Sequence, residues 1–154
     1  MILCLFAAAI AVLDQVVKYW VVDTIALGAQ TPGISGLFHL TYVQNTGASF
    51  YMLSGYRWFF VAVLAAFIVV LAVLIWKKVL SRPAELWCLF AILGGGVGNA
   101  VDRILHGYVV DMIEVEFMQF AVFNVADIFV TCGCIVLVLV VLFAKPKKEE
   151  AHEA

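Results

Sequence analysis

Polar side chains that could do chemistry interrupt segments of this chain that are otherwise apolar. They fall into three groups, which are Asp14 and Lys18, then Asn99, Asp102 and Arg103, then Asn124 and Asp127. Within each group, members three or four residues apart lie on one face of a helix. Ionisable groups in an apolar segment cost kilocalories each, so several of them at one depth indicate a shared functional site.

Carboxylates dominate the chemistry that such a site could perform. Two neighbouring aspartates around one water can hydrolyse an amide, because one removes a proton from the water while the other, protonated, donates to the carbonyl oxygen. Two close carboxylates in a partly desolvated site do not both ionise readily, so one keeps its proton. This chemistry needs neither a metal nor a cofactor, and none is predicted. The acidic candidates are Asp14, Asp23, Asp102, Asp111, Glu114, Glu116 and Asp127.

Two rival chemistries find less support in the sequence. A serine hydrolase would use Ser49 or Ser54 with His39 or His106, but the chain has no G-x-S-x-G turn to present the serine. A metal site would place histidines and carboxylates three or four residues apart on a helix, and the histidines here are isolated from one another.

The elements that must position these residues are transmembrane helices. The chain has 154 residues, of which 66% are hydrophobic and 13% charged, and a mean hydropathy of +1.09. Crossing about 30 Å of hydrocarbon takes roughly 20 residues. Four stretches are long enough, at residues 2–22, 57–76, 84–103 and 124–144. The sequence therefore predicts one domain, an all-α integral membrane protein with four transmembrane helices.

The positive charges predict how these helices are oriented. Lys and Arg concentrate in two places, between the second and third spans and after the fourth, at Lys77, Lys78, Arg82, Lys145, Lys147 and Lys148. Because cationic loops stay on the cytoplasmic side, both chain ends should be cytoplasmic. Loops 23–56 and 104–123 then lie outside the cytoplasm, and the polar groups of the spans gather near the outer face.

Both outer loops carry signals of local structure. Residues 37–45, "LFHLTYVQN", predict a short strand of a small extracytoplasmic β-element. After Gly107, a period of two would put Asp111, Ile113, Val115 and Phe117 on one face of a strand and Met112, Glu114, Glu116 and Met118 on the other, where the glutamates can face water. An amphipathic helix over 112–120 is the alternative. Asp111 and Asn45 could each simply form a turn.

Other polar or small residues also have purely structural interpretations. Asp14 and Lys18 could neutralise one another so that the first helix inserts, and Arg103 could anchor a helix end at the lipid headgroups. Gly94 and Gly98 form a small-xxx-small pattern that favours close packing of two membrane helices. Such packing would bring the polar faces of different helices within reach of one another.

Five motifs occur in an order that resembles one family. They are "DQVVK" at 14–18, "NTGASF" at 45–50, "GNAVDR" at 98–103, "VVDMI" at 109–113 and "FNVAD" at 123–127. This set, on a chain with four spans, resembles the bacterial lipoprotein signal peptidases, also called signal peptidase II. Each motif alone would be weak evidence, and the ordered set over nearly the whole chain is specific.

The resemblance implies an aspartic endopeptidase of the bacterial cytoplasmic (inner) membrane. Its substrates would be diacylglyceryl-modified prolipoproteins, cleaved just before the lipidated cysteine. It implies Asp111 and Asp127 as the catalytic pair. The residues that it assigns to substrate binding and support of the pair are Asp14, Lys18, Asn45, Gly47, Asn99, Asp102, Arg103 and Asn124. We further expect membrane phospholipid as a partner, no nucleic acid, and function as a monomer.

Without the resemblance, two questions stay open. Asp102 and Asp111 are both candidates for the partner of Asp127, although the apolar face expected around Asp111 favours it slightly. A small proton- or cation-coupled transport protein is the alternative function, since carboxylates in a membrane can relay protons or bind cations. Transport sites usually lie near the midplane of a repeated architecture, which this sequence does not show. The G-x-G-D signature of presenilin-type proteases is also absent.

Overall fold

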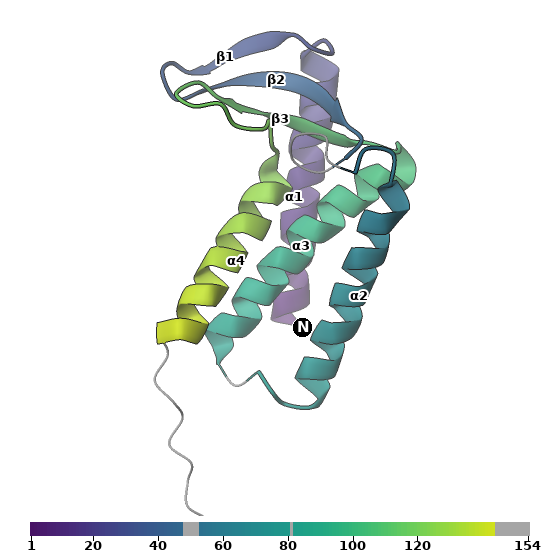
Figure 1. The fold of residues 1–154 in the computed structure, drawn as a ribbon, viewed down its shortest axis with the longest axis vertical. Coiled ribbons are helices and arrows are strands. Elements are labelled where there is room, and N and C mark those ends of the chain that lie inside the picture. The colour runs from purple at the N-terminus through teal and green to yellow at the C-terminus, as the bar shows by residue number, and fades with distance from the viewer. Residues whose placement is uncertain (48–52, 81, 144–154) are drawn as a thin grey trace, which may run out of the picture.

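A computed structural model describes residues 1–47, 53–80 and 82–143 of the chain. In these residues, a bundle of helices carries a small antiparallel sheet at one end (Figure 1). The helices are α1 (Ile2–Thr24), α2 (Arg57–Trp76), α3 (Pro83–Leu105) and α4 (Val125–Phe143). The strands are β1 (Gln30–Ile34), β2 (Phe38–Asn45) and β3 (Val109–Val115).

The helices coincide with the predicted spans. All 4 are long and apolar enough to cross a membrane. The second matches its predicted bounds, and the described bounds of the others differ from the prediction by one or two residues, the usual uncertainty at helix ends. The prediction of a mostly helical protein with four transmembrane helices is confirmed. Residues 144–154, with the basic tail, lie outside the described residues.

Helix α3 is the centre of the bundle and packs against each of the other helices. Glycines permit the close approach. A Cβ at Gly94 would lie 2.7 Å from the carbonyl oxygen of Ala7 on α1, and one at Gly98 would lie 2.5 Å from a carboxylate oxygen of Asp14. The close packing expected from Gly94 and Gly98 is therefore present, and it brings the polar face of α1 against α3.

The outer surface of the bundle is apolar. On α2 only Leu71 is buried, and large hydrophobic side chains such as Trp58, Val69 and Trp76 are exposed. A water-soluble protein rarely exposes apolar surface over entire helices, whereas hydrocarbon is a suitable solvent for it. The exposed side chains agree with a multi-pass membrane protein.

The sheet has the order β1-β2-β3 with antiparallel neighbours. The strand predicted at 37–45 is β2, and β3 from the second loop joins it. Val43 pairs with Asp111, and Asn45 pairs with Val109. The strand interpretation of the segment after Gly107 is therefore correct, and the amphipathic helix over 112–120 is not formed.

The predicted alternation along β3 is only partly correct. Met112, expected beside the glutamates on the face toward water, is 1% exposed and packs with Val21 of α1 and Tyr42 of β2. Asp111 is also buried, whereas Phe117, expected on its apolar face, is 64% exposed. The first half of β3 lies over the helices and is covered on both sides, so its burial does not follow a period of two.

The segment before α4 is tied to β3. Phe123 pairs with Ile113 through backbone hydrogen bonds in both directions, of 2.8 and 3.1 Å. This bridge places the start of α4 beside the middle of β3. At the opposite end of the bundle lie the N-terminus, the connection between α2 and α3 and the end of α4 (Figure 1).

Candidate active site

A buried lysine joins the polar residues of α1 and α3. The ammonium of Lys18 lies 2.8 Å from Asp14 Oδ2 and 3.0 Å from Asp102 Oδ2, and it donates to Asn99 Oδ1 at 2.8 Å. An ammonium has three N–H donors, so all of them have acceptors here. Asp14, Lys18 and Asp102 are each 2% exposed or less. The predicted pairing of Asp14 with Lys18 is present, and Asp102 is a second partner.

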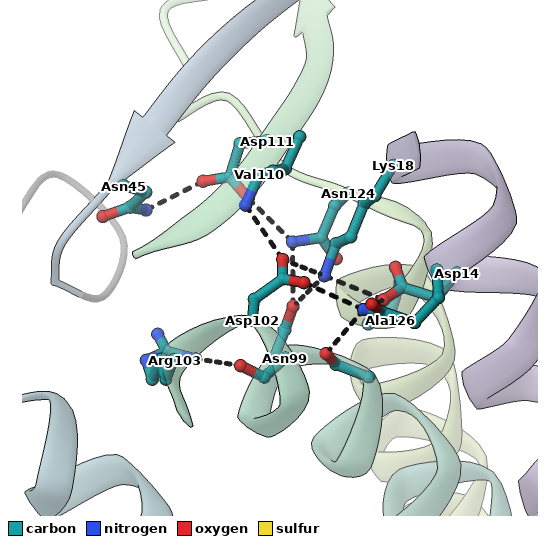
Figure 2. Close-up of polar contacts among 12 residues, drawn as sticks. Asp14, Lys18, Asn45, Asn99, Asp102, Arg103, Val110, Asp111, Asn124 and Ala126 are labelled. Atoms are coloured by element: carbon teal, nitrogen blue, oxygen red, sulfur yellow. Dashed lines mark hydrogen bonds and ion pairs between the residues drawn. The ribbon is translucent and has the colours of Figure 1, made fainter. Parts of the chain in front are cut away.

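Asp14 and Asp102 each also accept a backbone N–H from another element. Asp14 Oδ1 accepts from Ala126 N, at the start of α4, at 2.9 Å. Asp102 Oδ2 accepts from Val110 N, on β3, at 3.0 Å (Figure 2). Asp14 therefore attaches α4 to α1, and Asp102 attaches β3 to α3. Gln15 was not predicted as a site residue, and its amide donates to Asp102 Oδ1 at 2.9 Å.

The motif "FNVAD" begins α4 with a reciprocal cap. Asn124 Oδ1 accepts from Asp127 N at 3.0 Å, and Asp127 Oδ2 accepts from Asn124 N at 3.2 Å. This is a capping box built from Asn and Asp, and it satisfies N–H groups that a helix start leaves free. The other oxygen of Asp127, Oδ1, accepts from Asn99 Nδ2 at 2.8 Å.

Asp111 is held by two asparagine amides. Asn124 Nδ2 donates to Asp111 Oδ1 at 2.7 Å, and Asn45 Nδ2 donates to Asp111 Oδ2 at 2.8 Å (Figure 2). Asp111 lies within β3, so its interpretation as a turn residue is wrong. Asn45 both accepts from Gly47 N at 2.9 Å, as in an Asx turn, and contacts the carboxylate, so its two interpretations are compatible.

The pKa of Asp111 is raised from 3.8 to about 6. Burial is the largest cause and the nearby carboxylate of Asp127 adds to it, whereas the hydrogen bonds from Asn45 and Asn124 and the charge of Lys18 oppose the rise. A carboxyl group with such a pKa exchanges its proton near neutral pH, which suits general acid–base work.

Arg103 connects the end of α3 with the segment after β2. Its guanidinium donates to the carbonyl oxygens of Gly47 at 2.8 Å and Asn99 at 3.4 Å. It also lies over the ring of Phe60 on α2, 4.3 Å from the ring centroid. Arg103 therefore bonds within the protein rather than projecting as a headgroup anchor. Residues 48–52, including Ser49 and the end of the motif "NTGASF", lie outside the described residues.

A cavity of about 690 Å³ adjoins one part of this network. Its polar lining includes Asn45, Asn99, Arg103, Asp111, Asn124, Asp127 and Thr131, and Gly47 also lines it. Its apolar lining includes Phe60, Val63 and Leu64 of α2 and Ile128 of α4. Lys18 and Asp102 line a different cavity, between α1, α3 and β3. The two aspartates that share the first cavity are therefore Asp111 and Asp127.

All the site residues predicted from the sequence lie together in one polar layer, between the helices and beneath the sheet. Asp14, Lys18 and Asp102 form its charged interior, and the others line the cavity. The sequence analysis did not identify the backbone N–H groups of Val110 and Ala126 as donors, because their side chains give no sign of this role. It also missed Gln15, although this residue lies three residues before Lys18 in "DQVVK".

Metal ligands do not gather in the part of the chain that the structure describes, where no group of three or more His, Cys, Asp or Glu side chains is placed to hold an ion. The histidine on β2, His39, instead contacts Glu114 at 2.7 Å on the sheet surface. That the site works without a metal stays a prediction.

Comparisons with known proteins agree on one family. A family model described as signal peptidase (SPase) II matches residues 6–143. Lipoprotein signal peptidases of Streptococcus pyogenes serotypes M2 and M6 are 43% and 42% identical over 130 residues, covering 82% of this chain and 84% of theirs.

Two solved structures of bacterial membrane enzymes share the fold. A bacterial membrane enzyme determined by the in meso method at 2.3 Å superposes with a TM-score of 0.86 and 29% identity, covering 95% of this chain and 92% of that one. Another, at 1.9 Å, gives a TM-score of 0.82 at 29% identity, covering 92% of both chains. The ordered motifs, the helices around a shared polar layer and these matches together lead to one conclusion: the chain belongs to the signal peptidase II family of membrane peptidases.

Proposed function

We propose that this protein is an aspartic endopeptidase that removes the signal peptide from diacylglyceryl-modified prolipoproteins, cutting just before the lipidated cysteine. The observation that carries the proposal is that Asp111 and Asp127 line the same cavity and are bridged by Asn124. Family membership supports a peptidase rather than the transport protein considered as the alternative.

Asp111 and Asp127 divide the chemistry of hydrolysis between them. With one proton shared by the pair, the ionised carboxylate removes a proton from a water, which attacks the scissile carbonyl carbon. The protonated carboxyl group donates to the carbonyl oxygen, and the proton taken from the water is later delivered to the leaving amine. The amides of Asn45, Asn99 and Asn124 hold both carboxylates in place.

The lining of the cavity suits a substrate that is part peptide and part lipid. The scissile bond would lie at the polar wall, where Asp111 and Asp127 are found. The acyl chains of the modified cysteine would lie along the apolar wall of Phe60, Val63 and Leu64. Because acyl chains prefer apolar surroundings, this placement keeps them in contact with hydrocarbon during cleavage.

We place the protein in the bacterial cytoplasmic membrane with both termini in the cytoplasm. The chain start, the end of α4 and the connection with Lys77, Lys78 and Arg82 lie at one end of the bundle, and the sheet and polar layer lie at the other. Cationic segments remain on the cytoplasmic side, so the site faces outward. The protein acts as a monomer among membrane phospholipids, without nucleic acid. A reporter enzyme active only outside the cytoplasm, fused after α4, should stay inactive.

Cleavage of a purified prolipoprotein tests the catalytic pair. Wild type in detergent should cleave the diacylglyceryl-modified substrate and not the unmodified one, with mass spectrometry placing the new N-terminus at the lipidated cysteine. Asp111→Asn and Asp127→Asn should abolish cleavage while remaining folded. The matched control is Asp23→Asn, which neutralises an exposed aspartate outside the cavity and should cleave normally. Activity of Asp111→Asn with loss of activity in Asp102→Asn would instead make Asp102 the partner of Asp127.

A further inference from the structure

Three asparagines present an amide NH₂ group to the two carboxylates of the cavity. Asn45 and Asn124 donate to Asp111, and Asn99 donates to Asp127, at 2.7 to 2.8 Å. An asparagine amide can rotate by half a turn and present its oxygen instead, which would repel a carboxylate. Something must therefore fix the orientation of each amide.

In all three cases a group that can only donate holds the amide oxygen. Asn45 Oδ1 accepts from Gly47 N, and Asn124 Oδ1 accepts from Asp127 N. Both asparagines stand at the end of a strand or the start of a helix, where backbone N–H groups are free. Asn99 lies inside α3, whose own N–H groups are used by the helix. Its oxygen is held by the ammonium of Lys18 at 2.8 Å.

We propose that Lys18 is a positioning residue that fixes the Asn99 amide so that its NH₂ group points at Asp127. The ammonium has no acceptor atom, so the atom of Asn99 that faces it must be the oxygen, and the NH₂ group then faces the carboxylate. Asn124 Nδ2 adds a second donor to the same oxygen at 3.0 Å.

The surroundings of Lys18 hold it in this role. Asp14 and Asp102 accept its other two N–H donors, and the side chain is buried. Lys18 does not line the cavity that contains Asp111 and Asp127. It therefore acts on the reaction through Asn99 and not through the substrate. This inference rests on the proposed function, since it assigns a role in aligning the carboxylate of Asp127.

A double-mutant cycle between Lys18 and Asn99 tests the proposal. Lys18→Met keeps the length of the side chain and removes its donors, and Asn99→Leu removes the amide. Each single variant should lower kcat by about tenfold to a hundredfold, the range expected for one hydrogen bond to a charged group. The KM of Lys18→Met should change by less than about threefold, because Lys18 lies outside the cavity, whereas Asn99 lines it.

The cycle distinguishes positioning from simple structural support. If Lys18 acts through the amide, adding Lys18→Met to the Asn99→Leu variant should lower kcat by less than about twofold further. Multiplicative losses, or a loss confined to KM, would overturn the proposal. If Lys18→Met does not fold, the same cycle is measured in an Asp102→Asn background, where one of the two carboxylates left without the ammonium is already neutral.

The same measurements separate this inference from the proposed function. If Asp111→Asn and Asp127→Asn abolish cleavage but Lys18 and Asn99 give multiplicative effects, the catalytic pair stands and the positioning role fails. If Asp127→Asn still cleaves, the proposed function fails, and the role of Lys18 in aligning Asp127 fails with it.

Discussion

Two pairs of aspartates lie in the same polar layer and differ in what surrounds them. Asp14 and Asp102 both contact the ammonium of Lys18, and each accepts a backbone N–H from a different element. Asp111 and Asp127 are held by asparagine amides and line the cavity. The first pair therefore joins the helices and β3 around a buried cation, whereas only the second pair faces the cavity that could hold a substrate. The partners therefore divide four aspartates between support and chemistry.

The largest effect on activity is expected from neutralising one member of the cavity pair, Asp111 and Asp127. Asp127→Asn should abolish measurable cleavage, a loss in kcat of about 10⁴-fold or more, at the upper end of what a general acid or base contributes. Its unfolding temperature should change little, because an asparagine can still accept one hydrogen bond at the start of α4. Cleavage kinetics and thermal unfolding in the same detergent measure both effects. A variant that loses stability and activity together would place Asp127 with the supporting pair.

Neutralising a member of the supporting pair, Asp14 and Asp102, should lower the stability of the protein more than its activity. Asp14→Asn removes a charge that contacts Lys18 at 2.8 Å in a buried site. Breaking a buried ion pair costs about 3–5 kcal/mol of stability, reduced here because Asp102 remains as a partner. Thermal unfolding should show this loss, and Asp23→Asn, at an exposed site, gives the matched control. Unchanged unfolding would mean that Asp14 does not support the fold.

The sequence could predict most of these residues but not their division of labour. The spacing of Asp14 and Lys18 on one helix predicts their pairing, because it depends only on local geometry. The partner of Asp127 depends on how β3 lies over the bundle. From the sequence, Asp102 and Asp111 are nearly equal candidates, with Asp111 only slightly favoured. The structure distinguishes them, because Asp102 contacts Lys18 and Asp111 lines the cavity.

Backbone donors account for the rest of what the sequence did not reveal. The N–H groups of Val110 and Ala126 bind the supporting carboxylates, and any residue type except proline supplies such a donor. The burial of Met112 escaped prediction because β3 is covered on both sides by elements distant in the sequence. The four helices were predictable because length and hydropathy, which decide membrane insertion, are local properties.

The dependence of stability on pH sharpens the comparison at Asp111. Its pKa is raised from 3.8 to about 6, mainly by burial, so between these values the folded protein holds more protons than the unfolded chain. The stabilisation is complete below the lower value and is lost as the pH rises through the upper one. It amounts to at most about 3 kcal/mol. Unfolding of wild type and Asp111→Asn should therefore diverge as the pH falls from about 7 to about 4. Parallel curves would show that Asp111 titrates normally.

A pair of neighbouring glycines tests whether close helix packing maintains the polar layer. A Cβ at Gly95 would collide with the backbone carbonyl of Ala126, the residue whose N–H binds Asp14. A Cβ at Gly96 would meet only the end of the Leu64 side chain, 2.8 Å away, which can rotate aside. Gly95→Ala should therefore cost about 1–3 kcal/mol, as overpacking does, because a backbone atom must move. Gly96→Ala should be neutral or slightly stabilising, since alanine favours a helix by about 1 kcal/mol over glycine.

Thermal unfolding and cleavage should be measured for both glycine variants, to test whether the contacts of the supporting pair and those of the cavity pair can be disturbed separately. If displacement of α4 disturbs the bond between Ala126 and Asp14, Gly95→Ala should lose activity as well as stability, because Asp127 follows Ala126 directly. If α4 can shift without moving Asp127, stability should fall while kcat is retained. Equal effects at Gly95 and Gly96 would show that the backbone contact has no special role. The distinction matters because the supporting and cavity pairs meet at this one turn of α4, where adjacent residues bind Asp14 and line the cavity.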